Sequence, residues 1–282
     1  MKRLRHYNQG TAIVLSCFGS VVEQQRYQQL AKHVQDQYPE TQVRIATSSK
    51  MVIKKLARQG EACASLPQVL ADLDTQGYER ILVVSVYLFP TDEHRYLTSI
   101  VDGFKQFSLA SIEQTPAIMH HSQHTSRLLA ALHQRFASDS GFNLYVHHGA
   151  PLLDNPGHQS IHYCDSLLGK LSPRNFTCSL EGAWPFALLK DQLCAEIKAA
   201  HQGEGKPVLT IIPLLLVSGN HFVNDMKAIK AELEAEFEVG IAKPVQGDKF
   251  CMLDMPELVA IMDKQISDGL TRLKAPEAVN HG

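Results

Sequence analysis

Short apolar segments alternate with longer amphipathic segments along the whole chain. Three strand-like segments lie in the first half, AIVLSCF (12–18), QVRIAT (42–47) and RILVVSVYLF (80–89). The same order recurs in the second half, as NLYVHH (143–148), NFTCSL (175–180) and PVLTIIPLLLV (207–217). Amphipathic stretches near 20–37 and 122–137 predict helices among them. Because such alternation requires crossover connections, it predicts an α/β fold with parallel sheets.

The residues that follow the predicted strands recur at a nearly constant spacing. The pairs compared are Gly19 with Gly149, Ser48 with Glu181, and His94 with His221. Their separations are 149 − 19 = 130, 181 − 48 = 133 and 221 − 94 = 127 residues. A duplicated unit gives such a constant offset. We therefore expect two similar doubly wound parallel-sheet domains with a cleft between them.

The spacing places the domain boundary near residues 120–140, since no linker rich in Pro, Gly or Ser marks it. The expected domains are residues 1–128, an N-terminal α/β domain, and residues 129–282, a C-terminal domain that carries the metal site. After residue 250 a last amphipathic helix is predicted, and it could pack back on the first domain. Its apolar positions are Leu258, Ile261, Met262, Ile266 and Leu270.

Composition narrows the class of protein. The chain has 282 residues, of which 44% are hydrophobic and 20% charged, with a formal net charge of −2. Charges of both signs are scattered along it, so neither nucleic acid nor an acidic membrane surface is an expected partner. Assembly into a homo-oligomer stays open. The longest apolar run, 208–217, is far shorter than the ~20 residues that span a bilayer.

Cysteine spacing and the first residues bear on the compartment. The six cysteines form no Cys-x-x-Cys pair, which argues against a thiolate zinc site or a redox motif and favours reduced thiols in a cytoplasmic protein. The basic start followed by an apolar segment is similar to a signal peptide. The polar insert at 7–10 and the lack of an Ala-x-Ala site argue against that interpretation.

Polar side chains follow three strands of the second half. They are His148, Glu181 and His221. In parallel sheets the carboxyl ends of the strands meet at one edge, where ligands bind. Two imidazoles and a carboxylate suit Co²⁺, Fe²⁺, Ni²⁺ or Zn²⁺ better than Mg²⁺ or Ca²⁺. The sequence thus predicts a metal site here.

Structural roles for these histidines stay open, because the chain has fourteen of them. The cluster MHHSQH (119–124) is more typical of a polar inter-domain segment than of a metal site. His147 shares a strand with His148, so the period-2 alternation points its side chain the other way. Nucleotide phosphate loops and Gly-x-Ser-x-Gly elbows do not follow any predicted strand, so no nucleotide cofactor is expected.

Several segments resemble, in order, the blocks of a known family. They are LSCFGS, RIATSSKMVIKKL, GYERILVVSVYLFPTDEHRYL, VHHGAP, SLEGAWP and IIPLLLVSGNHFVNDM, within residues 11–270. The chain is similar in these blocks to the anaerobic-type sirohydrochlorin cobalt chelatases, which are class II chelatases with a ferrochelatase-like fold. The resemblance implies two similar α/β domains, a tetrapyrrole cleft and ATP-independent insertion of Co²⁺, often also Fe²⁺, in cobalamin or sirohaem synthesis.

The resemblance also implies roles for the residues at the strand ends. His148 becomes the first metal-ligand histidine, His221 the second, and Glu181 the acidic residue, which accepts a pyrrole proton as the metal enters. Two departures stand out. His147 stands where the family has a glycine, and Tyr87 stands where the family has a histidine. His94 could compensate for the loss of that histidine. The metal ion is then a substrate, Co²⁺ with Fe²⁺ and Ni²⁺ as alternatives.

Sirohydrochlorin is a polycarboxylate, so the resemblance predicts cationic and polar groups around the substrate. The candidates for contacting it are Tyr87, His94, Arg44 and Ser48, together with Lys50 and Lys54. Two other functions stay open. One is a haem or tetrapyrrole carrier of the same fold, with Tyr87 or a histidine as axial ligand. The other is a plain metal-binding α/β protein.

Overall fold

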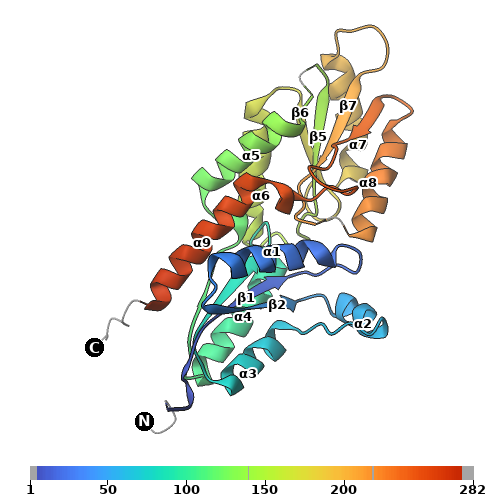
Figure 1. The fold of residues 1–282 in the computed structure, drawn as a ribbon. Helices are drawn as coiled ribbons and strands as arrows, with labels where there is room; N and C mark the ends of the chain where they lie inside the picture. Colours follow the sequence, from blue (N-terminus) through green and yellow to red (C-terminus); the bar gives the residue numbers. More distant parts are fainter. Residues whose placement is uncertain (1–4, 139, 218, 275–282) are drawn as a thin grey trace. The chain divides into compact units, whose positions relative to one another are not determined.

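The computed structural model describes residues 5–138, 140–217 and 219–274, without the side chains of residues 220–222. Contacts between residues divide the chain into two compact units. The described residues of unit 1 are 5–87, 93–118 and 260–274, and those of unit 2 are 88–92, 119–138, 140–217 and 219–259. Each unit contains one parallel sheet with helices on both of its faces (Figure 1).

The two sheets have the same topology. Unit 1 contains β1 (Gln9–Cys17), β2 (Thr41–Thr47), β3 (Tyr78–Val86) and β4 (Ser111–Gln114) in the order β2-β1-β3-β4. Unit 2 contains β5 (Phe142–His147), β6 (Asn175–Ser179), β7 (Val208–Pro213) and β8 (Glu238–Ile241) in the order β6-β5-β7-β8. The second order is the first with four added to every number. The predicted α/β fold with two similar parallel sheets is therefore confirmed.

Two details of the sheets differ from the sequence pattern. Strand β7 ends at Pro213, although the apolar run continues to residue 217. Leu214 is nevertheless buried, and its N–H donates to the Val146 carbonyl at 2.8 Å. A run of aliphatic residues thus indicates that a segment is buried, but the segment can be a loop as well as a strand. The edge strands β4 and β8 have four residues each and were not predicted, because so short a run carries little periodicity.

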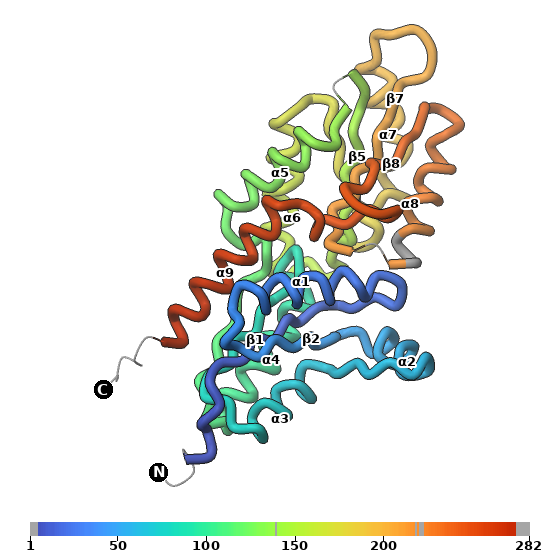
Figure 2. Tube along the Cα trace, viewed as in Figure 1, coloured from blue at the N-terminus to red at the C-terminus, as the bar shows by residue number. Residues whose placement is uncertain are grey.

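Helices connect the strands. Unit 1 contains α1 (Gln24–Gln37), α2 (Lys50–Arg58), α3 (Leu66–Gln76) and α4 (Asp92–Phe107), and unit 2 contains α5 (Ser122–Phe136), α6 (Gly157–Leu171), α7 (Phe186–Ala200) and α8 (Asn220–Leu233). Helix α9 (Pro256–Lys274) begins in unit 2, and from residue 260 it belongs to unit 1. Figure 2 traces α9 in red, toward the C-terminal end of the chain. Short 3₁₀ helices lie at Ile118–His120 and Met252–Asp254.

Local sequence sets the ends of α2 and α3. The Ser49 hydroxyl accepts a hydrogen bond from the Val52 N–H at 3.3 Å and so caps the first turn of α2. Ser65 and Gln68 form a capping box at the start of α3. Helix α3 ends where Gly77 adopts the left-handed conformation, with φ of 79°. Both helices begin near the carboxyl end of β2, because α2 starts three residues after Thr47 and the Thr47 N–H donates to the Ala64 carbonyl just before α3.

Alternation along the strands divides the core of unit 1 between two faces. Val14 and Val83 belong to a buried cluster that α3 and α4 complete. Leu82 points to the opposite face, toward α9. A Cβ placed on Gly269 of α9 would lie 2.6 Å from the Leu82 Cδ1 atom, so the helix packs very closely on β3. The glycine permits this approach.

Unit 2 follows the same rule. Leu144 and Val146 of β5 pack in a buried cluster with residues of α7 and α8. Tyr145 points to the other face, where its hydroxyl lies 2.8 Å from Nδ1 of His133 on α5. Helices cover both faces, so each sheet is doubly wound and its ligand-binding edge is the carboxyl end of its strands.

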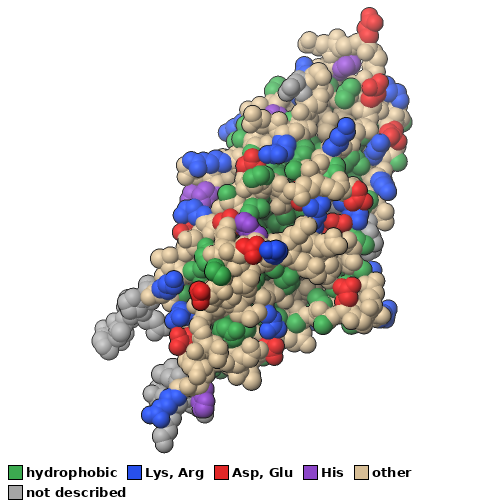
Figure 3. All heavy atoms as spheres, in the orientation of Figure 1, with side chains coloured by type: hydrophobic (Ala, Val, Ile, Leu, Met, Phe, Trp, Pro, Cys, Tyr) green, Lys and Arg blue, Asp and Glu red, His purple; other side chains and the backbone are tan. Residues whose placement is uncertain are grey.

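The surface agrees with the composition. Basic and acidic side chains are interspersed over the face drawn in Figure 3. Among the described helices, none has the length and hydropathy required to cross a bilayer. The six cysteines are free, and all but Cys63 are buried, as expected for thiols that act as small apolar groups.

Candidate functional site

His148 and Glu181 lie side by side just beyond the ends of β5 and β6. The Glu181 N–H donates to the His148 carbonyl at 3.1 Å, which continues the pairing of the two strands past the sheet. Nδ1 of His148 lies 3.4 Å from Oε1 of Glu181. Their side chains are 64% and 60% exposed, so solutes can reach both. The structure thus brings two of the three predicted metal ligands together.

Two glycines make this close approach possible. Gly149 has φ of 92°, and a Cβ built on it would lie 1.8 Å from the Glu181 carbonyl oxygen. Gly182 has φ of 80°, and its Cβ would lie 2.2 Å from the carbonyl oxygen of Ala150. Each turn therefore fills the space that a side chain of the other would need. The spacing of His148 and Glu181 is set by this interlock.

Hydrogen bonds within unit 2 fix the two turns further. The Ser179 N–H donates to the Trp184 carbonyl at 2.9 Å, and the Ser179 hydroxyl donates to the Ala183 carbonyl at 2.8 Å. Trp184 adopts φ of 57°, which is unusual for a residue with a side chain. In the turn after β5, Nε2 of His158 lies 2.8 Å from the Leu152 carbonyl. Hydrogen bonds therefore fix the conformation of both turns.

The His148–Glu181 spacing suits a shared metal ion. If both donor atoms form bonds of about 2.1 Å, a separation of 3.4 Å corresponds to an angle of about 108° at the ion, near the tetrahedral value. Within the described residues, no group of three His, Cys, Asp or Glu side chains converges on one point. The third predicted ligand, His221, lies in the first turn of α8, and its side chain is outside the described residues.

His147 is turned away from this pair, as the strand alternation predicted. Its side chain is 1% exposed, and Nε2 lies 3.7 Å from Oδ1 of Asp165 on α6. The Phe89 ring packs edge-on against it. The consecutive histidines therefore have separate environments, and only His148 reaches the exposed end of the strand.

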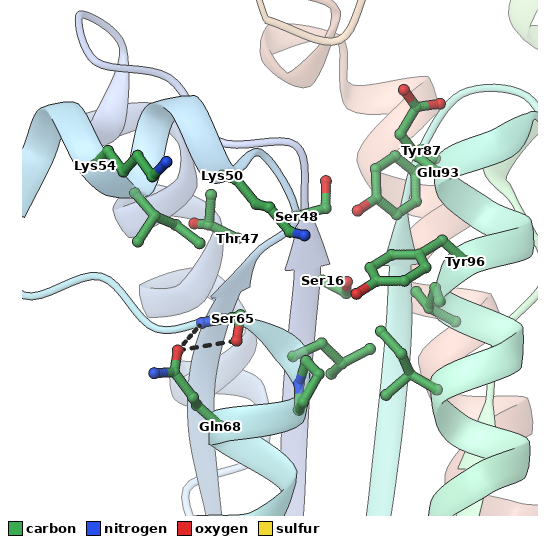
Figure 4. Close-up of a pocket in the computed structure, with 15 residues that line it drawn as sticks. Ser16, Thr47, Ser48, Lys50, Lys54, Ser65, Gln68, Tyr87, Glu93 and Tyr96 are labelled. Atoms are coloured by element: carbon green, nitrogen blue, oxygen red, sulfur yellow. Dashed lines mark hydrogen bonds between the residues drawn. The ribbon is translucent and has the colours of Figure 1, made fainter.

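The strand ends of unit 1 form a pocket of about 420 Å³ (Figure 4). Its polar lining includes Ser16, Ser48, Lys50, Lys54, Tyr87 and Glu93. Three of the predicted substrate-contacting residues, Ser48, Lys50 and Lys54, thus line the same pocket as Tyr87, which is a fourth. Ser16 and Glu93 were not predicted from the sequence. Ser16 could have been noticed as the polar residue within the apolar run AIVLSCF.

Tyr87 is the most buried of these polar groups, with 7% of its surface exposed. Its hydroxyl oxygen is buried and has no partner with hydrogen-bond geometry among the described residues. Burial raises the pKa of Tyr87 to about 12, although the nearby Ser48 and Ser16 hydroxyls oppose the rise. The phenol is therefore neutral near pH 7 and is available as a hydrogen-bond donor.

The remaining predicted residues lie elsewhere in unit 1. Arg44 is in the middle of β2, where its guanidinium lies 3.3 Å from the carboxylate of Asp72 on α3, and it does not line the pocket. Nδ1 of His94 on α4 lies 2.7 Å from the Ser85 hydroxyl. Neither residue joins the lining around Tyr87, because strand direction and helix packing send their side chains to other partners.

A model of the family described as Cobalt chelatase (CbiK) matches residues 11–266. The sirohydrochlorin cobaltochelatase of Salmonella typhimurium is 24% identical over 187 residues, which are 64% of this chain and 65% of that protein. The match therefore spans slightly less than two thirds of that relative's length.

Solved structures show the same fold at low identity. SirB from Bacillus subtilis with Fe³⁺ has a TM-score of 0.64 and 14% identity, covering 93% of this chain and 95% of that one. The sirohydrochlorin chelatase SirB from Bacillus subtilis subspecies spizizenii, in complex with cobalt, has a TM-score of 0.59 and 12% identity, covering 93% and 96%. Each likeness establishes a shared architecture.

Proposed function

This chain belongs to the cobalt chelatase (CbiK) family, and on that premise we propose that it inserts a divalent metal ion into sirohydrochlorin without ATP. Co²⁺ is the proposed metal and Fe²⁺ the first alternative. The relative from Salmonella typhimurium is a sirohydrochlorin cobaltochelatase, and the two SirB structures hold Fe³⁺ and cobalt. The product belongs to cobalamin or sirohaem synthesis in this proposal.

The observation that carries the proposal is the His148–Glu181 pair. An imidazole nitrogen and a carboxylate oxygen 3.4 Å apart, both exposed, form an open binding site for a borderline metal ion. An open site suits this reaction, because the enzyme must release the ion to the macrocycle rather than retain it. In the proposal His221 supplies a third ligand from the start of α8.

The proton balance assigns Glu181 a second role. Insertion replaces two pyrrole N–H protons by one dication, so two protons must leave the macrocycle. The Glu181 carboxylate accepts a proton as the ion moves from protein to nitrogen ligands, since a carboxylate that loses its metal regains a free lone pair. The exposed position of Glu181 then lets this proton, and the second one, pass to water.

The haem-carrier alternative is less favoured. Axial ligation by Tyr87 requires the phenolate, whereas burial raises the pKa of Tyr87 to about 12. A pyridine haemochrome spectrum of the purified protein tests the carrier directly, since a carrier would hold haem in stoichiometric amount.

Absorbance of the macrocycle tests the chelatase proposal. Sirohydrochlorin is mixed with Co²⁺, Fe²⁺ or Ni²⁺, without nucleotide, and the rate with enzyme is compared with the uncatalysed rate. We expect acceleration with Co²⁺ or Fe²⁺ and its loss in His148→Ala. Rates equal to the uncatalysed control with all three metals would contradict the proposal.

A further inference from the structure

The pocket of unit 1 contains two buried hydroxyl groups with unused hydrogen-bonding capacity. The Tyr87 Oη and Ser48 Oγ atoms are both buried, and neither has a partner with hydrogen-bond geometry among the described residues, although the Ser48 and Ser16 hydroxyls lie near Tyr87. A buried donor without a partner destabilises the folded protein, so such groups usually mark a place where a bound molecule completes the hydrogen bonding. Tyr87 extends from the end of β3 and Ser48 from the end of β2.

The charge of the pocket is positive. Lys50 and Lys54 line it, and no ion pair of either lysine is found among the described residues. Glu93 is the acidic group of the lining. In Figure 4 the Lys50 amine points into the space beside Ser48 and Tyr87, whereas the Glu93 carboxylate points away from it. The hydroxyl groups therefore face a cation rather than an anion.

The backbone adds to this field. Helix α2 begins at Lys50 and α3 at Leu66, and both residues line the pocket. The amino end of a helix carries a partial positive charge that favours anions. The two helix ends therefore add to the positive potential of the pocket in which the unpartnered Tyr87 hydroxyl lies.

We propose that this pocket binds a carboxylate group, to whose oxygens Tyr87 and Ser48 donate hydrogen bonds while Lys50 balances its charge. Two hydroxyl donors match the two oxygens of a carboxylate. Two lysines against one glutamate match a monoanion better than a phosphate dianion. The volume of about 420 Å³, roughly that of fourteen water molecules in the liquid, holds a carboxylate-bearing side chain.

Two sources could supply this carboxylate. One is an arm of the tetrapyrrole, and this source rests on the proposed function. The other is a free small dicarboxylate. Glutarate, followed by ligand-detected NMR titration, tests the pocket alone, and metal-free sirohydrochlorin, followed by absorbance at equilibrium, tests the arm. Dimethyl glutarate serves as the uncharged control ligand.

Matched variants isolate the two chemical contributions. Tyr87→Phe removes only the hydroxyl, and Tyr78→Phe makes the same change at the other end of β3. Lys50→Met removes a charge from the pocket, and Lys55→Met removes one from α2 outside it. We expect Tyr87→Phe to weaken binding about 10- to 100-fold, because a hydrogen bond to a charged group is lost. Both control variants should bind within about twofold of the wild type.

The pattern of losses identifies the source. Weaker binding of sirohydrochlorin in Tyr87→Phe and Lys50→Met supports the substrate arm, and weaker binding of glutarate alone supports a free dicarboxylate. Unchanged affinity for both ligands in both variants overturns the site, and so does equal binding of the dimethyl ester.

Turnover separates this inference from the proposed function. A wild-type protein that inserts metal while the pocket variants bind normally keeps the function and loses the site. A wild-type protein that binds carboxylates in the pocket but inserts no metal keeps the site and loses the function.

Discussion

Replacing Gly149 by alanine tests whether the interlocked turns set the spacing of the metal ligands. The new Cβ would lie 1.8 Å from the Glu181 carbonyl oxygen, while Cβ contacts shorter than 3.0 Å essentially never occur. The two turns must therefore separate by at least 3.0 − 1.8 = 1.2 Å. Carried to the side chains, this shift takes the 3.4 Å spacing to about 4.6 Å, beyond the ~4.2 Å that an ion with bonds near 2.1 Å can bridge.

The expected effect has two parts. A misplacement of about 1 Å can reduce catalysis about 100-fold, but both side chains are exposed and can readjust, so we expect a 10- to 100-fold loss of insertion rate for Gly149→Ala. Stability should fall by about 2–5 kcal/mol, the sum of the left-handed backbone strain of an alanine and the cost of overpacking.

Two glycines of the same unit provide controls. Gly205 has φ of 88°, and a Cβ added there would have no atom within 4 Å, so Gly205→Ala reports backbone strain alone. Gly169 lies in α6, also with nothing within 4 Å, and Gly169→Ala should stabilise by about 0.5–1 kcal/mol. Insertion rates come from macrocycle absorbance and stabilities from urea denaturation. A Gly149→Ala protein as active as wild type, and no less stable than Gly205→Ala, would refute the interlock.

Three further predictions concern separate parts of the protein. Glu181→Gln should lower turnover about 10²- to 10⁴-fold while sirohydrochlorin binding survives, and unchanged turnover at saturating metal would exclude the proton-acceptor role. The folded-state pKa of Tyr87 is raised from 10.0 to about 12, so the stability it contributes is present below pH 10 and is lost as pH rises through 12. Relative to Tyr87→Phe, the wild type should therefore lose up to about 2.7 kcal/mol of folding stability as the pH rises through these two values. The two proteins are compared in thermal melts from pH 8.5 to 11, and a stability difference that stays constant would contradict the raised pKa. Gly269→Ala places a Cβ 2.6 Å from the flexible Leu82 side chain and should cost about 1–3 kcal/mol in urea denaturation, and an unchanged midpoint would mean that α9 shifts freely on β3.

The sequence pattern was sufficient for the architecture because burial and periodicity are local properties. Apolar runs located β1, β3 and β5 within a few residues of their observed bounds. The alternation along β5 separated His147, which is buried against α6, from His148, which is exposed beyond the strand. Short edge strands such as β4 were not predicted, since four residues are too few to show a periodic pattern.

The candidate site was only partly predictable. The rule that ligands gather at the carboxyl ends of parallel strands selected His148 and Glu181, and the structure places them 3.4 Å apart. Their roles as metal ligand and proton acceptor stay predictions, as does that of His221. The same rule could not predict that Arg44 forms an ion pair with Asp72, because that contact depends on how α3 packs on the sheet.

By itself, then, the sequence determined which segments are strands, which faces they bury and which side chains emerge at their ends, since each follows from periods of two and 3.6 residues along a single segment. Only the tertiary structure decided the spacings between segments. The fit of Gly149 against the Glu181 carbonyl, and the enclosure of the Tyr87 hydroxyl beside Ser48, each join residues more than thirty positions apart. Such distances depend on steric contacts between packed elements, and the order of residues along one element does not encode them.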